Sequence, residues 1–333
     1  MIVFEPEYYE KFCCIAAACP DSCCKEWEVD VDDEAASRYR AMPGALGDRL
    51  RQVLRDTEGG TIMTIENGRC PMWRQDGLCR IQAECGHDAL CKTCREFPRL
   101  RHDYGDFVEL GLELSCPEAA RLILSVPAGP MISREIPGGE APEYDEEAME
   151  ILRLSREQAL ALLSDPRYSL PQALAILLLF GHDVQAQLDG CPEAPWDPDA
   201  ALEEAAGYAA EGDMAQIFRF FGDLEILTPA WKTRLSAPPS LPRWEPSHRA
   251  MARYMVKRYW LQAVSDYDII CRVKLCIIAC LLVAALGGDP VETAQQFSKE
   301  IENNPDNVEA ILDGAYRSPA LTDLQLISLL LKG

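Results

Sequence analysis

Positive charge and histidine are both scarce in this chain of 333 residues. It carries 32 lysine and arginine residues against 54 aspartate and glutamate residues, which gives a formal net charge of −22. So acidic a composition argues against a surface that coats DNA or RNA, and we expect no nucleic-acid partner. The 4 histidines show no paired spacing of the kind that binds zinc.

Long apolar runs and export signals are missing as well. The longest apolar run, residues 275–286, is 12 residues long, well below the ~20 needed to span a bilayer, so we expect a buried helix and no membrane contact. Residues 1–7 have neither a basic start nor an apolar run followed by a small-residue cleavage site. We therefore expect a cytoplasmic protein, in which clustered cysteines bind metal or perform redox chemistry.

Cysteine is what this chain has in excess. Eleven of its 15 cysteines lie within the first 116 residues, and three of these fall in the segment 19–24. Cys-Pro steps at residues 70–71 and 116–117 are typical of cluster ligands. By contrast, Cys271, Cys276 and Cys280 lie on an apolar helical pattern and are expected to be core thiols.

An iron–sulfur cluster fits this cysteine pattern better than zinc does. Zinc sites typically use two CxxC knuckles or mixed cysteine and histidine ligands, and only residues 91–94 have the CxxC form. An irregular, all-cysteine set is more typical of an iron–sulfur centre. Zinc remains the alternative.

The sequence predicts a mainly α protein in three parts. Residues 1–126 form an irregular cysteine-rich metal-binding module with few short strands, residues 127–145 a Pro- and Gly-rich linker, and residues 146–333 an α-helical domain. Strands are expected at 61–66 and 107–114, and a Pro- and Trp-containing loop at 229–246. Helices are expected at 33–56 with a break at Pro43, and at 117–124, 146–164, 171–188, 200–221, 248–263, 268–286, 290–303, 307–316 and 322–331.

Five short motifs resemble the flagellin lysine N-methylase family. They are FxC at 12–14, CxDxCCxxW at 19–27, CP at 70–71 with GLCxIQ at 77–82, CRxxPR at 94–99 and SCPEAAR at 115–121. The resemblance continues through residues 253–286 and the FSxEIE segment at 297–302, so it covers essentially the whole chain. Each motif alone is weak, whereas the five together are highly specific.

The resemblance implies methyl transfer from S-adenosylmethionine to lysine ε-amino groups of flagellin, by a protein that holds an iron–sulfur cluster, most readily a 4Fe-4S cluster. Cys13, Cys85 and Cys91 look like extras in this sequence. If only four thiolates bind, we favour members of the 19–24 group together with Cys79 and Cys94. The family's metal-ligating cysteines map onto Cys14, Cys19, Cys23, Cys24, Cys70, Cys79, Cys94 and Cys116.

Side chains next to these cysteines are the remaining site candidates. Asp21, Trp27 and Glu118 are candidates for catalysis, although core packing of Trp27 and helix-dipole stabilisation by Glu118 are alternatives. Arg95 and Arg99 are candidates for binding the carboxylate of the methyl donor or shielding a cluster; the alternative is that they form ion pairs that fix the module.

Familiar cofactor motifs are missing from the chain. We find no strand-linked GxGxG loop, no CxxxCxxC spacing of radical S-adenosylmethionine enzymes and no cobalamin DxHxxG motif. The methyl-donor site is therefore not located by sequence. Two other functions remain open, namely a non-enzymatic metal-binding adaptor and an electron-transfer protein.

Overall fold

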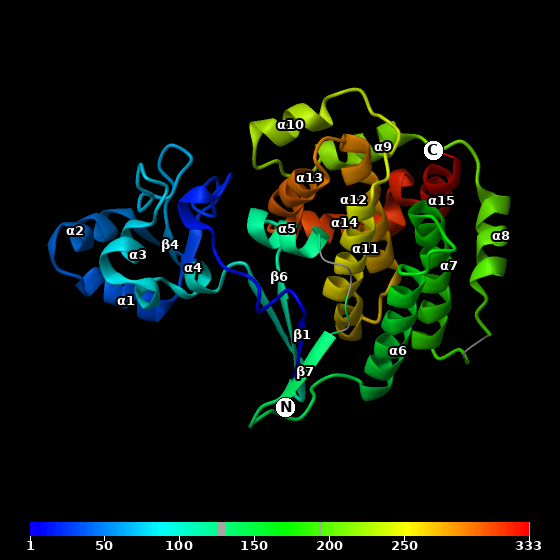
Figure 1. Ribbon diagram of the computed structural model, residues 1–333, viewed down its shortest axis with the longest axis horizontal. Helices are drawn as coiled ribbons and strands as arrows, with labels where there is room; N and C mark the ends of the chain where they lie inside the picture. Colours follow the sequence, from blue (N-terminus) through cyan, green and yellow to red (C-terminus); the bar gives the residue numbers. More distant parts are fainter. Residues whose placement is uncertain (126–128, 130, 193–194, 333) are drawn as a thin grey trace.

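The computed structural model describes residues 1–125, 129, 131–192 and 195–332, and it shows a small part and a large part (Figure 1). The small part, blue to cyan in Figure 1, projects from one side of the large helical part. Its regular elements are β2 (Val29–Val31), α1 (Asp33–Ala41), α2 (Gly44–Val53), β3 (Leu54–Thr57), β4 (Gly60–Met63), α3 (Arg80–Cys85) and α4 (Lys92–Glu96), with short 3-10 turns η1 (Ala16–Ala18) and η2 (His87–Ala89).

Local sequence explains the start of the small part. Asp32 caps α1, because one of its carboxylate oxygens accepts from the Ala35 N–H at 3.0 Å. The other oxygen accepts from the Lys92 N–H at 2.7 Å and so ties α1 to the start of α4. Pro43 and Gly44, the latter with φ of +75°, separate α1 from α2 as predicted.

The small part has its own hydrophobic core. An antiparallel sheet in the order β2–β4–β3 covers α1 and α2. The core includes Tyr39 and Leu50, both fully buried, and Met72 at 1% exposure. Two cysteines, Cys70 and Cys91, are among its buried members, and three more pack against its edge: Cys24, Cys79 and Cys94.

A four-stranded sheet joins the two parts. Its order is β5 (Arg99–Asp103), β6 (Phe107–Leu112), β1 (Ile2–Pro6) and β7 (Met131–Glu135). β1 runs parallel to β6 and antiparallel to β7, with Val3 opposite Val108 and Arg134. The chain therefore leaves this sheet after β1, builds the small part, and returns to the sheet at β5.

The large part is a helical body around one apolar helix. Helix α12 (Ile270–Leu286) is buried along almost its whole length, which confirms the buried helix predicted from the apolar run at 275–286. The other elements are α5 (Pro117–Ser125), α6 (Glu146–Leu162), α7 (Leu170–Leu188), α8 (Pro198–Tyr208), α9 (Met214–Gly222), α10 (Pro229–Leu235), α11 (Pro246–Tyr259), η3 (Trp260–Ser265), α13 (Pro290–Phe297), a π-helical turn η4 (Ser298–Glu302), α14 (Pro305–Arg317), η5 (Pro319–Leu321) and α15 (Asp323–Lys332).

The mainly α prediction is confirmed, and several details differ. The predicted loop at 229–246 begins with the helix α10. Thr228 caps the start of this helix, because its hydroxyl accepts from the Trp231 N–H. The single helix predicted for 200–221 is two helices: α8 ends at Tyr208, and Asp213 caps α9 by accepting from the Ala215 N–H. Ser328 and Gln325 of α15 accept from backbone N–H groups of the loop between α8 and α9. The helix expected at 290–303 ends at Phe297 and continues as the π-helical turn η4.

The linker predicted at 127–145 contains β7, and its residues 127, 128 and 130 lie outside the described residues. Most of the strands were not anticipated either, since β1, β2, β3, β5 and β7 are short. The hydrophobic cores also divide the chain differently from the predicted boundary at 126, because β6 and α5 pack into the core of the large part. Within the described residues, no helix is both long and apolar enough to cross a bilayer.

Candidate functional site

Nine cysteines of the small part and its border form one neighbourhood, here called the thiol group. Each lies within electrostatic reach of at least one other member, and they come from the loop before β2, the turn at 70–79, the start of α4 and the start of α5. All eight predicted ligands belong to it. Its members are Cys14, Cys19, Cys23, Cys24, Cys70, Cys79, Cys91, Cys94 and Cys116.

Backbone pairing brings the first two segments together. The Cys70 N–H donates to the Cys24 carbonyl at 2.8 Å, beside an isolated bridge between Lys25 and Arg69. A second bridge joins Trp73 to Cys79 and closes the turn that carries Cys79. Cysteines 46 positions apart in sequence thereby become neighbours without a disulfide.

Several thiols receive backbone N–H donors. The Ala16 N–H donates to Cys14 Sγ at 3.4 Å, and the backbone N–H groups two positions after Cys19, Cys70, Cys79 and Cys116 act to lower the pKa of each thiol. Cys79 and Cys91 also stand at the N-termini of α3 and α4. N–H donors and helix N-termini both stabilise a thiolate over a thiol. These donors are outweighed in Cys19, Cys79 and Cys116, where burial raises the pKa, and in Cys70, where the contact with Cys24 and burial raise it.

Thiol–thiol contacts shift the pKa values in opposite directions. Hydrogen bonds from Cys23 and Cys70 outweigh burial and lower the pKa of Cys24 to about 3. A hydrogen bond from Cys94 lowers the pKa of Cys91 to about 7, and the same contact raises the pKa of Cys94. Each contact thus favours one thiolate next to one protonated neighbour.

Neighbouring thiols are not yet a formed metal site. In the part of the chain that the structure describes, no three histidine, cysteine, aspartate or glutamate side chains have the arrangement that holds a metal ion. Cysteine thiolates are ordinary ligands of zinc and iron–sulfur centres, but metal binding by the thiol group stays a prediction.

Sequence reasoning set Cys91 aside, yet Cys91 is buried and belongs to the thiol group. The signal was available, because Cys91 and Cys94 have CxxC spacing. The other two extras, Cys13 and Cys85, are exposed. The predicted core thiols Cys271, Cys276 and Cys280 are all buried in α12, which confirms their structural role.

Asp21 and Trp27 both touch the same lysine of the large part. Asp21 Oδ2 lies 2.9 Å from Lys299 Nζ, and Asp21 Oδ1 lies 3.0 Å from Lys25 Nζ. The Lys299 ammonium also lies 5.0 Å from the centre of the Trp27 ring. Burial opposes ionisation of Asp21, but the two lysines outweigh it and hold the pKa of Asp21 below its usual value.

The other predicted side chains have simpler surroundings. Glu118 forms a two-bond ion pair with Arg121, at 2.6 and 2.8 Å, which lowers the pKa of Glu118. Arg99 is exposed on β5, with its guanidinium 5.1 Å from the centre of the Phe12 ring. Arg95 is half-buried in α4, next to Cys94. These contacts agree with structural roles for Glu118 and Arg99.

A cavity of about 600 Å³ lies beside the thiol group, where the small part meets the large part. We call it the seam cavity. Asp21 and Glu26 line it from the small part, and Pro117, which follows Cys116, lines it from α5. Lys299 and Glu300 reach it from the π-helical turn η4. Its volume falls within the range of small-molecule sites.

Buried polar contacts hold the two glutamates of the π-helical turn η4, Glu300 and Glu302. Glu300 accepts from the Leu227 N–H at 2.7 Å and from the Thr228 hydroxyl. Glu302 accepts from Tyr259 at 2.9 Å. π-helical turns inside helices often mark functional sites. Both glutamates belong to the FSxEIE motif, which the sequence analysis noted without assigning a role.

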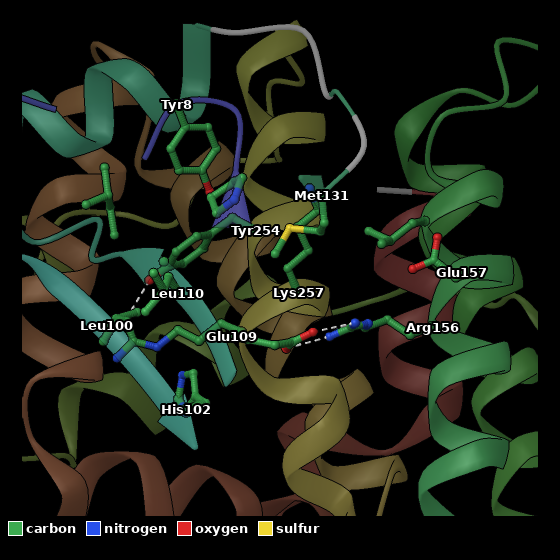
Figure 2. Close-up of a pocket in the computed structure, with 15 residues that line it drawn as sticks. Tyr8, Leu100, His102, Glu109, Leu110, Met131, Arg156, Glu157, Tyr254 and Lys257 are labelled. Carbon is green, nitrogen blue, oxygen red and sulfur yellow. Dashed lines mark hydrogen bonds and ion pairs between the residues drawn. The ribbon is translucent and has the colours of Figure 1, made fainter. Parts of the chain in front are cut away.

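A second, inner cavity lies between β5, β6, α6 and α11 (Figure 2). There Glu109 and Arg156 form a buried two-bond ion pair, at 2.6 and 2.8 Å. Burial and nearby arginines lower the pKa of Lys257 to about 8. This cavity has only about 40 Å³, enough for a few water molecules but too little for a nucleoside cofactor.

The fold and the thiol group together describe a cysteine-cluster protein with a helical body. Over 135 residues, or 38% of this chain and 78% of the relative, it is 35% identical to the flagellar biosynthetic protein FliU of Salmonella muenchen. Over 143 residues it is 33% identical to the lysine-N-methylases of Salmonella typhimurium and Salmonella choleraesuis. The chain belongs to the flagellin lysine N-methylase family, as its motifs predicted.

The match to the two lysine-N-methylases covers 40% of this chain and only 35% of either relative. No family model matches the chain. No solved structure matches it either. Family membership is therefore shown by sequence identity, while the activity of this chain is a separate question.

Proposed function

We propose that this chain is a protein-lysine N-methyltransferase that transfers methyl groups from S-adenosylmethionine to lysine side chains of flagellin. The observation that carries the proposal is its identity to proteins named lysine-N-methylase, aligned over 143 residues. The thiol group and the adjacent seam cavity support it, because they supply a metal-binding donor set next to a space large enough for a ligand.

The proposed reaction is an in-line displacement. The lysine nitrogen forms a bond to the methyl carbon while the bond from that carbon to the sulfonium sulfur breaks, and the bonding electron pair stays on sulfur as a thioether. The nitrogen must first lose a proton, since an ammonium has no lone pair to donate. Lysine has an ordinary pKa near ~10.4, so the site must favour the neutral amine at the moment of transfer.

Residues of the seam cavity suit the proton step. Burial raises the pKa of Glu300, against opposing hydrogen bonds from Thr228 and Leu227, so this carboxylate holds a proton more tightly than an exposed one. A bound sulfonium would in turn disfavour a second positive charge nearby and so promote loss of the ammonium proton. We assign proton acceptance to the carboxylates of the seam cavity.

The thiol group is proposed to hold an iron–sulfur cluster, with zinc as the alternative. When bound, such a centre supplies iron–thiolate bonds that tie the cysteine-bearing segments together. Cys24 and Cys91 are the best candidate thiolates, because neighbouring thiols lower their pKa values. The segment that carries Cys19, Cys23 and Cys24 also carries Asp21, a wall residue of the seam cavity.

The test is to incubate the anaerobically purified protein with flagellin and methyl-labelled S-adenosylmethionine and to map lysine mass shifts. We expect one-methyl mass increments on flagellin lysines, and none on flagellin whose lysines have been acetylated beforehand. Absence of transfer by a protein with full metal content would contradict the enzyme and favour the adaptor or electron-transfer function. A brown protein with sulfur-to-iron absorbance supports iron, whereas a colourless protein with stoichiometric zinc supports the alternative.

A further inference from the structure

The seam cavity has walls from both parts of the molecule. The loop 20–26 and the start of α5 form one side, and residues 228–230, α13 and η4 form the other. Asp289 and Glu292, near its edge, are exposed, whereas Glu300 has only 2% exposure. The cavity therefore leads from solvent towards the buried carboxylate of Glu300.

Negative charge dominates this lining. Five carboxylates face two cations, and both cations already have carboxylate partners: Arg121 pairs with Glu118, and Lys299 pairs with Asp21 and Glu26. An excess of acidic groups around a concave site attracts a cation and disfavours an anion. The five carboxylates are Asp21, Glu26, Asp289, Glu292 and Glu300.

Lys299 shows that this wall binds an ammonium group. Its Nζ lies 2.9 Å from Asp21 Oδ2, 2.7 Å from Glu26 Oε2 and 5.0 Å from the centre of the Trp27 ring. Two carboxylates of the lining thus hold one ammonium group, and the Trp27 ring, which does not line the cavity, adds a cation–π contact. Lys299 itself occupies the position between Asp21 and Glu26. Glu292 lies elsewhere on the lining, with its Oε1 3.5 Å from the Gln296 side-chain nitrogen.

Apolar residues complete the fit to a lysine side chain. Pro20, Pro117, Ala230 and Val291 line the cavity together with the carboxylates. An aliphatic stem packs on such surfaces while its charged end reaches polar groups. No aromatic ring is among the described residues that line the cavity, so nothing there offers a stacking surface for an adenine.

We propose that the seam cavity is the binding site for the acceptor lysine, which enters as an ammonium ion. The inference rests on the proposed function, because it gives a position to the substrate side chain of that reaction. Glu292 attracts the ammonium at the entrance, and the apolar residues hold its stem. The buried carboxylate of Glu300 then receives its head.

The test uses Nα-acetyl-lysine amide as the probe and saturation-transfer NMR on the metal-loaded protein as the measurement. Nα-acetyl-norleucine amide, which lacks the ammonium, is the matched probe. We expect the lysine probe to bind and Glu292→Lys to weaken it roughly five- to tenfold, because an attraction becomes a repulsion. Glu309→Lys, an exposed glutamate of α14, is the control variant and should leave binding unchanged.

Three results would overturn the inference: equal binding of the norleucine probe, equal binding by Glu292→Lys, or displacement of the lysine probe by S-adenosylmethionine. The last would make the cavity the methyl-donor site. The flagellin labelling experiment separates this inference from the proposed function. Methyl transfer without charge-dependent probe binding refutes the inference alone. Charge-dependent binding without transfer refutes the methyltransferase and leaves a cationic-amine site.

Discussion

The small part and the large part of this molecule are held together by different means. The small part has a core of fourteen buried residues, two of them cysteines, and thiols line its edge. The large part surrounds α12, whose residues are buried almost without interruption. A core as small as the first contributes little apolar burial, so such modules depend on metal ions or covalent ties. The comparison teaches that cysteine packs as a buried apolar side chain in α12, whereas in the small part it gathers with other thiols at the edge of a small core.

The largest expected effect comes from removing one thiol of the small part. We expect Cys94→Ser to lose the metal and to lower the free energy of opening of residues 27–94 by more than about 3 kcal/mol, because metal binding is coupled to folding. Metal analysis and amide hydrogen exchange measure the two effects. Cys276→Ser, a buried thiol of α12, should keep the metal and perturb only local packing. Equal metal content in both variants would refute the assignment of ligands.

A smaller effect is expected where the two parts meet. Lys299→Met removes the cation shared by Asp21 and Glu26 and leaves both carboxylates without it. Loss of one partner of a buried ion pair is costly, although partial exposure of both acids moderates the effect to about 2 kcal/mol. Hydrogen exchange should rise in the loop 19–26. Lys232→Met on the exposed face of α10 is the control, and an unchanged loop in Lys299→Met would refute the coupling.

The smallest effect is a pH dependence confined to the large part. Burial opposes ionisation of Asp323, but His182 and Lys274 outweigh it and lower the pKa to about 2. A depressed pKa contributes stability above the unfolded value of 3.8, and this contribution is lost as the pH falls towards 2. Since Asp323 is 38% exposed, we expect a loss of about 1 kcal/mol.

Denaturant unfolding of the wild type and of Asp323→Asn between pH 5 and pH 2 measures this contribution. The variant should lack the component due to Asp323, so the two stability curves should converge at low pH. Parallel curves would show that the carboxylate contributes nothing.

Periodic apolar patterns made the helices predictable. The helices α6 and α7 have buried faces that repeat with the apolar pattern of the sequence. Helix α12, predicted from an unbroken apolar run, is buried along almost its whole length. The strand β1 pairs with β6 and β7, which both lie more than a hundred residues later in the chain. Local sequence does not reveal such distant pairing, so β1 and β7 escaped prediction. The break in the helical pattern at 200–221 also involves distant residues, because Ser328 and Gln325 of α15 accept from backbone N–H groups of the loop between α8 and α9.

The candidate site, like the fold, has features that local sequence predicts and features that depend on distant residues. The family motifs selected eight of the nine cysteines in the thiol group, and their role as metal ligands stays a prediction. The motifs were not enough to place Cys91 among them, nor to find the seam cavity, because Lys299 meets Asp21 across 278 positions of sequence. The sequence predicts an ordinary helix where the π-helical turn η4 lies, because the spacing of apolar residues does not reveal the wider π-helical turn.

The sheet order also constrains when each part can form during synthesis. β1 lies between β6 and β7, so the first strand made has no partner until residue 107 has emerged, and lacks its second until residue 131 has. The small part, with its own core between residues 29 and 91, needs neither of these strands. This core can therefore form before the four-stranded sheet is complete, and every cysteine up to Cys94 is synthesised before either partner strand of β1.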